Sequence, residues 1–190
     1  VLNPPNLPCW RNFPLARAVE KAQRLPTRLD NDANAAALAE ARWGAGRGFQ
    51  AVFYATLGTG IGTGLILDGK IYHGRTGAAV EGGHISLDAK GWRCGCGQRG
   101  CIEALAAGPA VARRAQAAVR RDPRAGAALL RLADGQRAAI RAETVAEAWR
   151  AGDPLATALL DDTAGLLAQW LGAMVTLFEP EVIIFGGGMG

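Results

Sequence analysis

Apolar residues gather in short runs on both sides of a glycine-dense turn in the first half of the chain. The runs cover 50–57 and 63–68, and a third segment, 70–74, follows directly after Asp68-Gly69. Short apolar runs bounded by turn residues are typical of strands, and an Asp-Gly pair favours a tight turn between antiparallel neighbours. The pattern therefore predicts a three-stranded antiparallel meander.

Most of the remaining chain consists of strong helix formers. A helix is predicted at 33–43, with Asn31 and Asp32 where N-caps are favoured. Further helices are predicted at 102–121 with a break at Gly108-Pro109, at 125–133, at 144–151 with a capping box of Thr144 and Glu147, and at 154–178. A short apolar strand, 181–185, then enters a run of glycines. This order of strands, helices and a final strand predicts an α/β nucleotide-binding fold.

The start of the chain is rich in proline, which removes backbone donors and fixes φ, so segment 1–14 is predicted to be irregular. We divide the chain into residues 1–30, an irregular arm and connection, and residues 31–190, an α/β region. The second part contains a loop at 81–103 and a helical segment at 102–178. Because the final glycine turn should lead into a helix, we expect the sequence to be truncated at both ends.

The composition is that of a soluble globular protein, with 49% hydrophobic and 20% charged residues. No run approaches the roughly 20 consecutive apolar residues of a membrane helix, and the first residues lack a signal-peptide pattern. These observations favour the cytoplasm. The net charge of +4 comes mostly from arginine. The densest cluster, Arg113 to Arg124, lacks the interleaved aromatic residues of a nucleic-acid surface, and we interpret it as a solvated helix face.

Four residues form the pattern H-x9-C-x-C-x4-C: His84, Cys94, Cys96 and Cys101. One imidazole and three thiolates match a closed tetrahedral zinc site of the structural type. The glycines among them allow the tight bend that brings both ends of Cys-x-Cys to one ion. The alternative is that they are small buried residues, but a glycine-rich loop is where a core needs them least. Cys9 falls outside the pattern and is interpreted as structural.

Several motifs together resemble the ROK family of bacterial sugar kinases and sugar-responsive repressors. They are NDANAAALAE at 31–40, LGTGIGTG at 57–64, EGGH at 81–84, CGCGQRGCIEA at 94–104 and IIFGGG at 183–188. They occur in the family's order and spacing over most of the chain, although each glycine motif alone is weak. The resemblance implies an actin-like ATPase fold, related to ribonuclease H, in which two α/β lobes close on sugar and ATP. Residues 1–30 would then be the remainder of a truncated N-terminal lobe.

The resemblance also implies a role for each motif in the phosphorylation of a hexose, with glucose first, by ATP and Mg²⁺. Asp32 matches the catalytic base and, with Asn31, Glu81, His84 and Glu103, the sugar ligands. Gly58, Thr59, Gly60 and Gly62 match a phosphate loop, and Gly186, Gly187 and Gly188 match the loop beside the adenosine. From local sequence alone, Asp32 could equally be an N-cap and the glycine loop an ordinary hairpin turn. His84 could bind zinc through one ring nitrogen and sugar through the other.

Two other functions stay open. The family's repressors carry a DNA-binding domain before the sugar-sensing part, so the chain could be such a sensor; nucleic acid is a partner only in that case. It could also be an inactive sugar-binding scaffold stabilised by zinc. The family's first phosphate motif, D-x-G-G-T, does not occur in the 190 residues. The resemblance further implies a homodimer.

Overall fold

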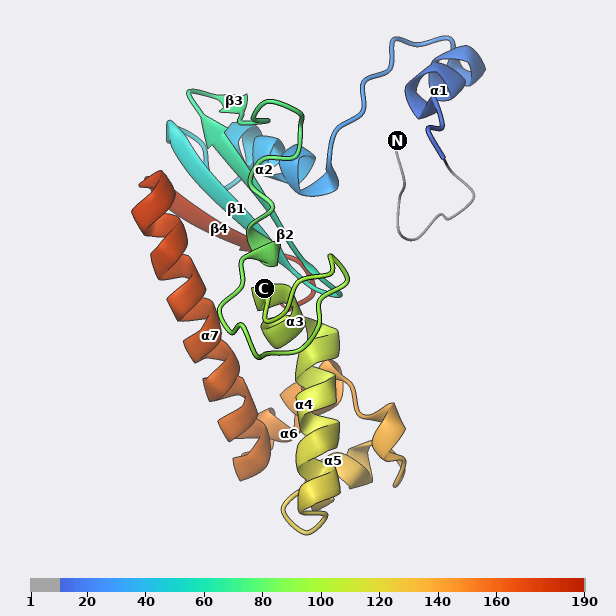
Figure 1. Ribbon diagram of the computed structural model, residues 1–190, viewed down its shortest axis with the longest axis vertical. Coiled ribbons are helices and arrows are strands. Elements are labelled where there is room, and N and C mark those ends of the chain that lie inside the picture. Colours follow the sequence, from blue (N-terminus) through green and yellow to red (C-terminus); the bar gives the residue numbers. More distant parts are fainter. Residues whose placement is uncertain (1–10, 190) are drawn as a thin grey trace. The chain divides into compact units, whose positions relative to one another are not determined.

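The computed structural model describes residues 11–189, and the first ten residues of the predicted arm, Cys9 included, lie outside them (Figure 1). The chain divides into two compact units, Val1–Asn31 and Asp32–Gly190. The described part of the first unit holds one helix, α1 (Leu15–Gln23). The prediction of an irregular arm and connection over residues 1–30 was therefore wrong for these nine residues. Past Pro14 the sequence LARAVEKAQ contains only residues that tolerate a helix, and Arg24 ends it in the left-handed conformation.

The second unit is built on a mixed four-stranded sheet in the order β3-β2-β1-β4. Its strands are β1 (Ala51–Leu57), β2 (Ile61–Leu67), β3 (Lys70–Ile71) and β4 (Val182–Gly186). The antiparallel pairing of β1 with β2 and of β2 with β3 confirms the predicted meander. β3 is shorter than predicted, and β2 begins two residues earlier than predicted. β4 lies parallel to β1, with Val52 beside Val182.

Seven α-helices lie in the part of the chain that the structure describes. Besides α1 they are α2 (Asp32–Trp43), α3 (Ile102–Ala106), α4 (Gly108–Arg121), α5 (Ala127–Leu132), α6 (Ala142–Arg150) and α7 (Pro154–Phe178). Short 3₁₀ turns occur at η1 (Gly82–His84) and η2 (Arg137–Ala139). The predicted break in the helical segment lies at Ala107, between α3 and α4.

The capping box predicted for α6 was wrong in its register. The helix begins at Ala142, so Thr144 is its third residue, and its hydroxyl accepts a hydrogen bond from the backbone N–H of Arg141. Arg141, rather than Thr144, stands at the N-cap. Ala142 and Glu143 are good helix formers, and this allows the helix to start two residues before the threonine.

Helix α2 packs on one face of the sheet at very short range. A Cβ atom added at Gly64 of β2 would lie 2.8 Å from Ala37 Cβ and 2.9 Å from the Ala33 carbonyl oxygen, so only glycine allows this approach. Ala37, Val52, Tyr54, Ile66 and Ile184 form the buried cluster between them. The close approach places the first turn of α2, with Asp32, along β2.

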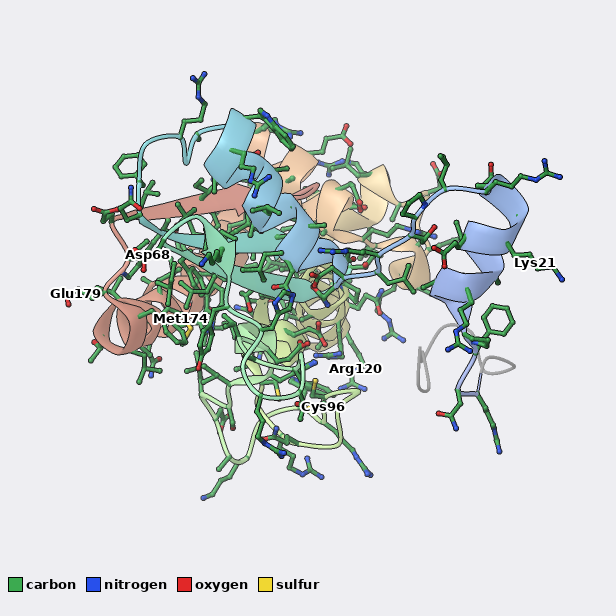
Figure 2. The ribbon with its side chains drawn as sticks, turned by 90° about the horizontal axis from the view of Figure 1, so that it is seen from above. Lys21, Asp68, Cys96, Arg120, Met174 and Glu179 are labelled. Carbon is green, nitrogen blue, oxygen red and sulfur yellow. The ribbon has the colours of Figure 1, made fainter. Side chains whose placement is uncertain are left out.

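The opposite face of the sheet is covered by α3 and the C-terminal half of α7 (Figure 1). Phe53 and Leu65 pack there against Trp170 and Met174 of α7, and Met174 is labelled in Figure 2. The N-terminal half of α7 joins a second buried cluster with α4, α5 and α6, which includes Leu129 and Ile140. α7 thus spans both the sheet and the helical end of the unit. No helix among residues 11–189 is long and apolar enough to cross a membrane.

Candidate functional site: a cysteine-histidine cluster beside a glycine hairpin

The four residues predicted to bind metal come together in one cluster. Their donor atoms all lie within 4.8 Å of one another, and these residues are His84, Cys94, Cys96 and Cys101. Cys94 Sγ is 3.6 Å from His84 Nδ1, and Cys96 Sγ is 3.6 Å from Cys101 Sγ. Figure 2 shows Cys96 in the loop region, where its side chain is exposed.

The two separations of 3.6 Å fit a tetrahedral zinc ion, and donor pairs as far apart as 4.8 Å would have to close by about 1 Å around it. With zinc–donor bonds of about 2.0 to 2.3 Å, tetrahedral donors are separated by roughly 3.3 to 3.8 Å. The sulfur separation is far above the roughly 2.05 Å of a disulfide. Nδ1 of His84 faces the sulfurs, which leaves Nε2 for another partner. His84, Cys94, Cys96 and Cys101 are therefore a candidate site for one zinc ion with four protein ligands.

The environments of the three thiols shift their pKa values in different directions. Burial raises the pKa of Cys101 to about 12 and also raises the pKa of Cys94. A backbone hydrogen bond from Gln98 lowers the pKa of the exposed Cys96. Buried thiols with a high pKa are poor nucleophiles, whereas a bound metal cation displaces their protons. Cys94 and Cys101 are thus suited to bind a metal rather than to attack a substrate.

Backbone hydrogen bonds shape the loop around these ligands. The N–H of Cys94 donates to Gln98 O at 2.8 Å, and the N–H of Gly97 donates to Cys94 O at 3.0 Å, which closes the turn that carries Cys96. The N–H of Ile102 donates to Ile85 O at 2.9 Å. This bond fastens the start of α3, next to Cys101, to the residue after His84.

Glu103 connects the cluster to the β1–β2 hairpin. Its Oε1 lies 3.6 Å from Cys94 Sγ and 3.9 Å from His84 Nδ1. Its Oε2 accepts a hydrogen bond of 3.0 Å from the N–H of Ile61, the first residue of β2. The carboxylate therefore lies between the predicted metal ligands and the hairpin turn, and its side chain is 28% exposed.

The hairpin turn separates this cluster from a cavity of about 610 Å³. Gly58 and Thr59 line the cavity, whereas a Cβ at Gly60 would meet Glu103 Oε2 on the other side. Gly62 packs instead against Ala33 and Thr56. The four predicted phosphate-loop residues are thus divided between the two sides of the hairpin.

The second glycine loop lies beside the first. The N–H of Met189 donates to Leu57 O at 3.0 Å, and the N–H of Gly108 donates to Gly58 O at 2.9 Å. Gly188 lines the cavity, but Gly186 and Gly187 are packed against Tyr54 and Leu57 of β1. Of the three predicted adenosine-loop glycines, Gly188 lines the cavity and the other two do not.

Sequence reasoning missed the helical wall of the cavity. Pro109, Ala112, Arg113 and Gln116 of α4 line it, and so do residues 138 and 140–143 between η2 and α6. The α4 positions follow the i, i+3, i+4, i+7 spacing of one helix face. That spacing was visible in the sequence, but the residue types are too varied to indicate a ligand.

Arg113 connects the cavity wall to Trp92, in the loop that carries Cys94 and Cys96. Its guanidinium carbon lies 4.5 Å from the centre of the Trp92 ring, and its Nη2 donates to Ala104 O. Its Nε is buried without a hydrogen-bond partner, and burial lowers the pKa of the guanidinium. A cation over an aromatic face is attracted by the ring electrons.

The remaining predicted site residues, Asn31, Asp32 and Glu81, line neither the cysteine-histidine cluster nor the cavity. Asp32 is the exposed first residue of α2, and its Oδ1 accepts a hydrogen bond of 2.9 Å from the N–H of Ala33. Glu81 is exposed and directly precedes η1. Asn31 belongs to the first unit, whose placement relative to the second is not described.

Comparisons with known proteins support a single family. The sequence model of the ROK family matches residues 1–190. A glucokinase from Streptomyces coelicolor is 40% identical over 184 residues, which are 95% of this chain and 57% of that relative. The chain therefore spans little more than half the length of the curated relatives it matches.

Solved structures give the same result. A ROK family glucokinase from Streptomyces griseus, in complex with glucose and AMPPNP, superposes with a TM-score of 0.86 at 42% identity, covering 95% of this chain and 58% of that one. A ROK family transcriptional regulator, a homolog of the E. coli MLC protein, superposes with a TM-score of 0.81 at 32% identity, covering 94% and 43%. The fold of this chain is therefore shared by enzymes and regulators.

Proposed function

Because the chain belongs to the ROK family, we propose that the protein phosphorylates a hexose, with glucose as the leading substrate, at the expense of ATP. The observation that carries the proposal is the place of the β1–β2 hairpin. Gly58 and Thr59 face a cavity of about 610 Å³, and the neighbouring Gly60 and Ile61 contact Glu103 beside the metal cluster. A phosphoryl group has to pass between a nucleotide site and a sugar site. This hairpin lies between a cavity large enough for a small molecule and a group of polar side chains that can bind hydroxyl groups.

The cavity is the proposed nucleotide site. Its volume lies within the roughly 300 to 1,000 Å³ of small-molecule pockets. Backbone N–H groups of glycine turns can converge on phosphate oxygens. Thr59 and Gly188 line the cavity, as does Gly58, whose own N–H already donates to Gly60 O at 3.0 Å. Mg²⁺ would arrive with the phosphates, which together with water supply most of its ligands. The wall of α4 and α6 would then surround the rest of the nucleotide.

The hexose would bind on the other side of the hairpin. Its hydroxyls require acceptors and donors at fixed positions, and the proposed ligands are Asn31, Asp32, Glu81, His84 and Glu103. Zinc held by His84 Nδ1 and the three cysteines would fix the imidazole so that Nε2 can meet a hydroxyl. The metal supplies structure, and the protein side chains supply recognition.

Asp32 is the proposed catalytic base. It would accept the proton of the attacking hydroxyl and, above all, orient that hydroxyl toward the phosphoryl group. Its exposure at the start of α2 leaves the carboxylate accessible to a substrate. The short approach of α2 to β2 at Gly64 keeps it near the hairpin.

A phosphorylation screen tests the proposal. The purified protein is incubated with ATP, Mg²⁺ and glucose, fructose, mannose or an N-acetylated hexosamine, and ADP release is coupled to a detectable reaction. We expect turnover that is fastest with glucose, together with one equivalent of zinc by metal analysis. No sugar-dependent ADP release with any of these sugars, in protein that is folded and holds its zinc, would refute the proposal.

The second candidate is a sugar sensor, and the similarity to the regulator structure favours it. A sensor would bind a hexose in calorimetry without releasing ADP, whereas a kinase would do both. We propose a cytoplasmic location for the kinase, because the metal needs reduced thiols and the cytoplasm keeps them reduced. A homodimer remains a prediction that sedimentation can test.

A further inference from the structure

The segment Glu81–His84, here called the recognition segment, is held in a way that neither charge nor burial of large side chains explains. It contributes Glu81 and His84 to the proposed hexose site, and the two residues between them are glycines that are buried. The residues on either side, Val80 and Ile85, pack partly against the core, but the buried backbone polar groups of the segment itself need hydrogen-bond partners.

Two buried side chains from distant parts of the chain bind the backbone of Gly82. The Thr63 hydroxyl on β2 accepts a hydrogen bond of 2.8 Å from the Gly82 N–H. Trp170 Nε1–H on α7 donates at 3.0 Å to the Gly82 carbonyl oxygen. Thr63 is 5% exposed and Trp170 is fully buried, so water does not compete for these bonds. Both polar groups of Gly82 are therefore held from opposite sides.

Thr63 also binds Val80, the residue that precedes the recognition segment. Its hydroxyl donates to the carbonyl oxygen of Val80. Val80 has φ of 60°, a left-handed conformation that is a genuine outlier for a β-branched residue. Such strain persists only where surrounding contacts over-determine it, and it is concentrated at functional sites.

The segment also lies directly on β2. A Cβ atom at Gly83 would be 1.9 Å from the Ile61 carbonyl oxygen, and one at Gly82 would be 3.5 Å from Met174 Sδ, the residue labelled in Figure 2. Ile61 is the same residue whose N–H binds Glu103. Contacts with Ile61, at the start of β2, therefore help to fix the positions of Glu81, His84 and Glu103.

We propose that Thr63 and Trp170 are positioning residues for hexose recognition, which act by fixing the backbone between Glu81 and His84. The inference rests on the proposed function, because it assigns the recognition segment to the hexose. Neither side chain needs to touch the sugar. Both act through the peptide groups of Gly82, and Thr63 additionally holds the strained Val80.

The test compares Thr63→Val with Thr63→Ser. Valine keeps the shape and suits a strand, but it leaves the Gly82 N–H and the Val80 carbonyl without their partner; serine keeps the hydroxyl. Hexose and nucleotide affinities are measured by calorimetry, and zinc affinity by competition with a chromophoric chelator. We expect Thr63→Val to weaken zinc and hexose binding about tenfold each, as changes around metal ligands do, with nucleotide affinity unchanged. Thr63→Ser should restore both.

Thr163→Val is the matched control. Thr163 is likewise a buried threonine, 4% exposed, but its hydroxyl bonds to Leu159 O and Arg114 within the helical end. It should lower stability without changing zinc or hexose affinity. Trp170→Phe should act in the same direction as Thr63→Val, because phenylalanine cannot donate to Gly82 O.

The outcomes separate the inference from the proposed function. Unchanged zinc and hexose affinities in a folded Thr63→Val protein would overturn the inference. An equal loss of zinc, hexose and nucleotide affinity would also overturn it, since that indicates general damage. If the unsubstituted protein binds zinc but no hexose, and Thr63→Val weakens zinc binding, the positioning of His84 is supported and the proposed function is refuted.

Discussion

The β1–β2 hairpin and the loop 74–100 both bring residues to the candidate site, but different forces hold them. Seven residue pairs join β1 to β2, and large apolar side chains such as Phe53 and Leu65 are fully buried between the sheet and α7. In the loop, the buried residues are Gly82, Gly83, Cys94 and Gly100. None of these is a large hydrophobic residue, and Val80, Ile85 and Leu87 of the loop are only partly buried against the core, so apolar burial holds the loop more weakly than the hairpin.

Because of this difference, we expect the two regions to respond differently to metal removal. The hairpin and α2, which carry the proposed phosphate turn and Asp32, should keep their shape without metal. The loop, which carries Glu81 and His84, should depend on zinc and on a few buried hydrogen bonds. Changes on the first side are then expected to affect turnover, and changes on the second side sugar binding.

The largest expected effect is on turnover. Asp32→Asn should lower kcat about 10³-fold, within the usual range for loss of a general base, while hexose affinity and the melting temperature stay unchanged. Steady-state kinetics and calorimetry measure the two quantities. Asp68→Asn is the control, since Asp68 lies in the β2–β3 turn at the other end of β2 (Figure 2). Unchanged turnover in Asp32→Asn would show instead that Asp32 is only a helix cap, because asparagine caps a helix as well as aspartate does.

Metal removal should have the next largest effect. Cys96→Ser, or dialysis against a chelator, should weaken hexose binding about 100-fold because the recognition segment loses the anchor at His84. Nucleotide affinity should not change. Zinc content by mass spectrometry and both affinities by calorimetry test this, with Cys9→Ser as a cysteine control. If the metal-free protein bound sugar normally, the proposed dependence of the loop on zinc would be wrong.

A core substitution should act on both regions alike. Phe53 is fully buried and packs edge-on against Trp170, with ring centres 6.1 Å apart. Phe53→Leu should lower the free energy of unfolding by about 1.5 kcal/mol through lost packing, without changing the zinc content of the folded protein. Denaturant unfolding measures the loss. Phe49→Leu is the control, because Phe49 is 42% exposed; an equal effect there would contradict the burial argument.

The smallest effect is expected at the contact between the metal loop and the cavity wall. Trp92→Leu removes the ring under Arg113 and should cost about 0.5 to 1 kcal/mol of stability, as for a partly exposed cation–π pair. Zinc content should be unchanged. Thermal melts compare it with Trp43→Leu, where the ring is 76% exposed. A loss of zinc in Trp92→Leu would place this residue among the supports of the metal site.

Local patterns in the sequence were sufficient for much of the fold. The helix at 33–43, the meander and the helix at 154–178 were predicted to within two residues, apart from the length of β3. Each of these follows from neighbouring residues alone. The cysteine-histidine pattern also predicted which four side chains come together. Metal spacing is readable because ligand chemistry limits the residue types so strongly.

Contacts between distant residues could not be read in this way. The sequence did not indicate that β4 pairs with β1, that Glu103 Oε2 binds Ile61, or that Trp170 binds Gly82. Helix α1 was missed because the prolines before it dominated the interpretation, and the α6 cap because two registers were compatible with Thr144.

By itself, the sequence determined most of the elements of this protein, the four side chains of the candidate metal site and the family, because each depends on residue types at short spacing. The tertiary structure decided which sides of the glycine loops face the cavity, how α2 meets β2 at Gly64, and how Thr63 and Trp170 hold Gly82. The reason is physical. Backbone groups of glycine carry no pattern of their own, so their partners depend only on which distant side chains the folded chain brings within hydrogen-bonding distance.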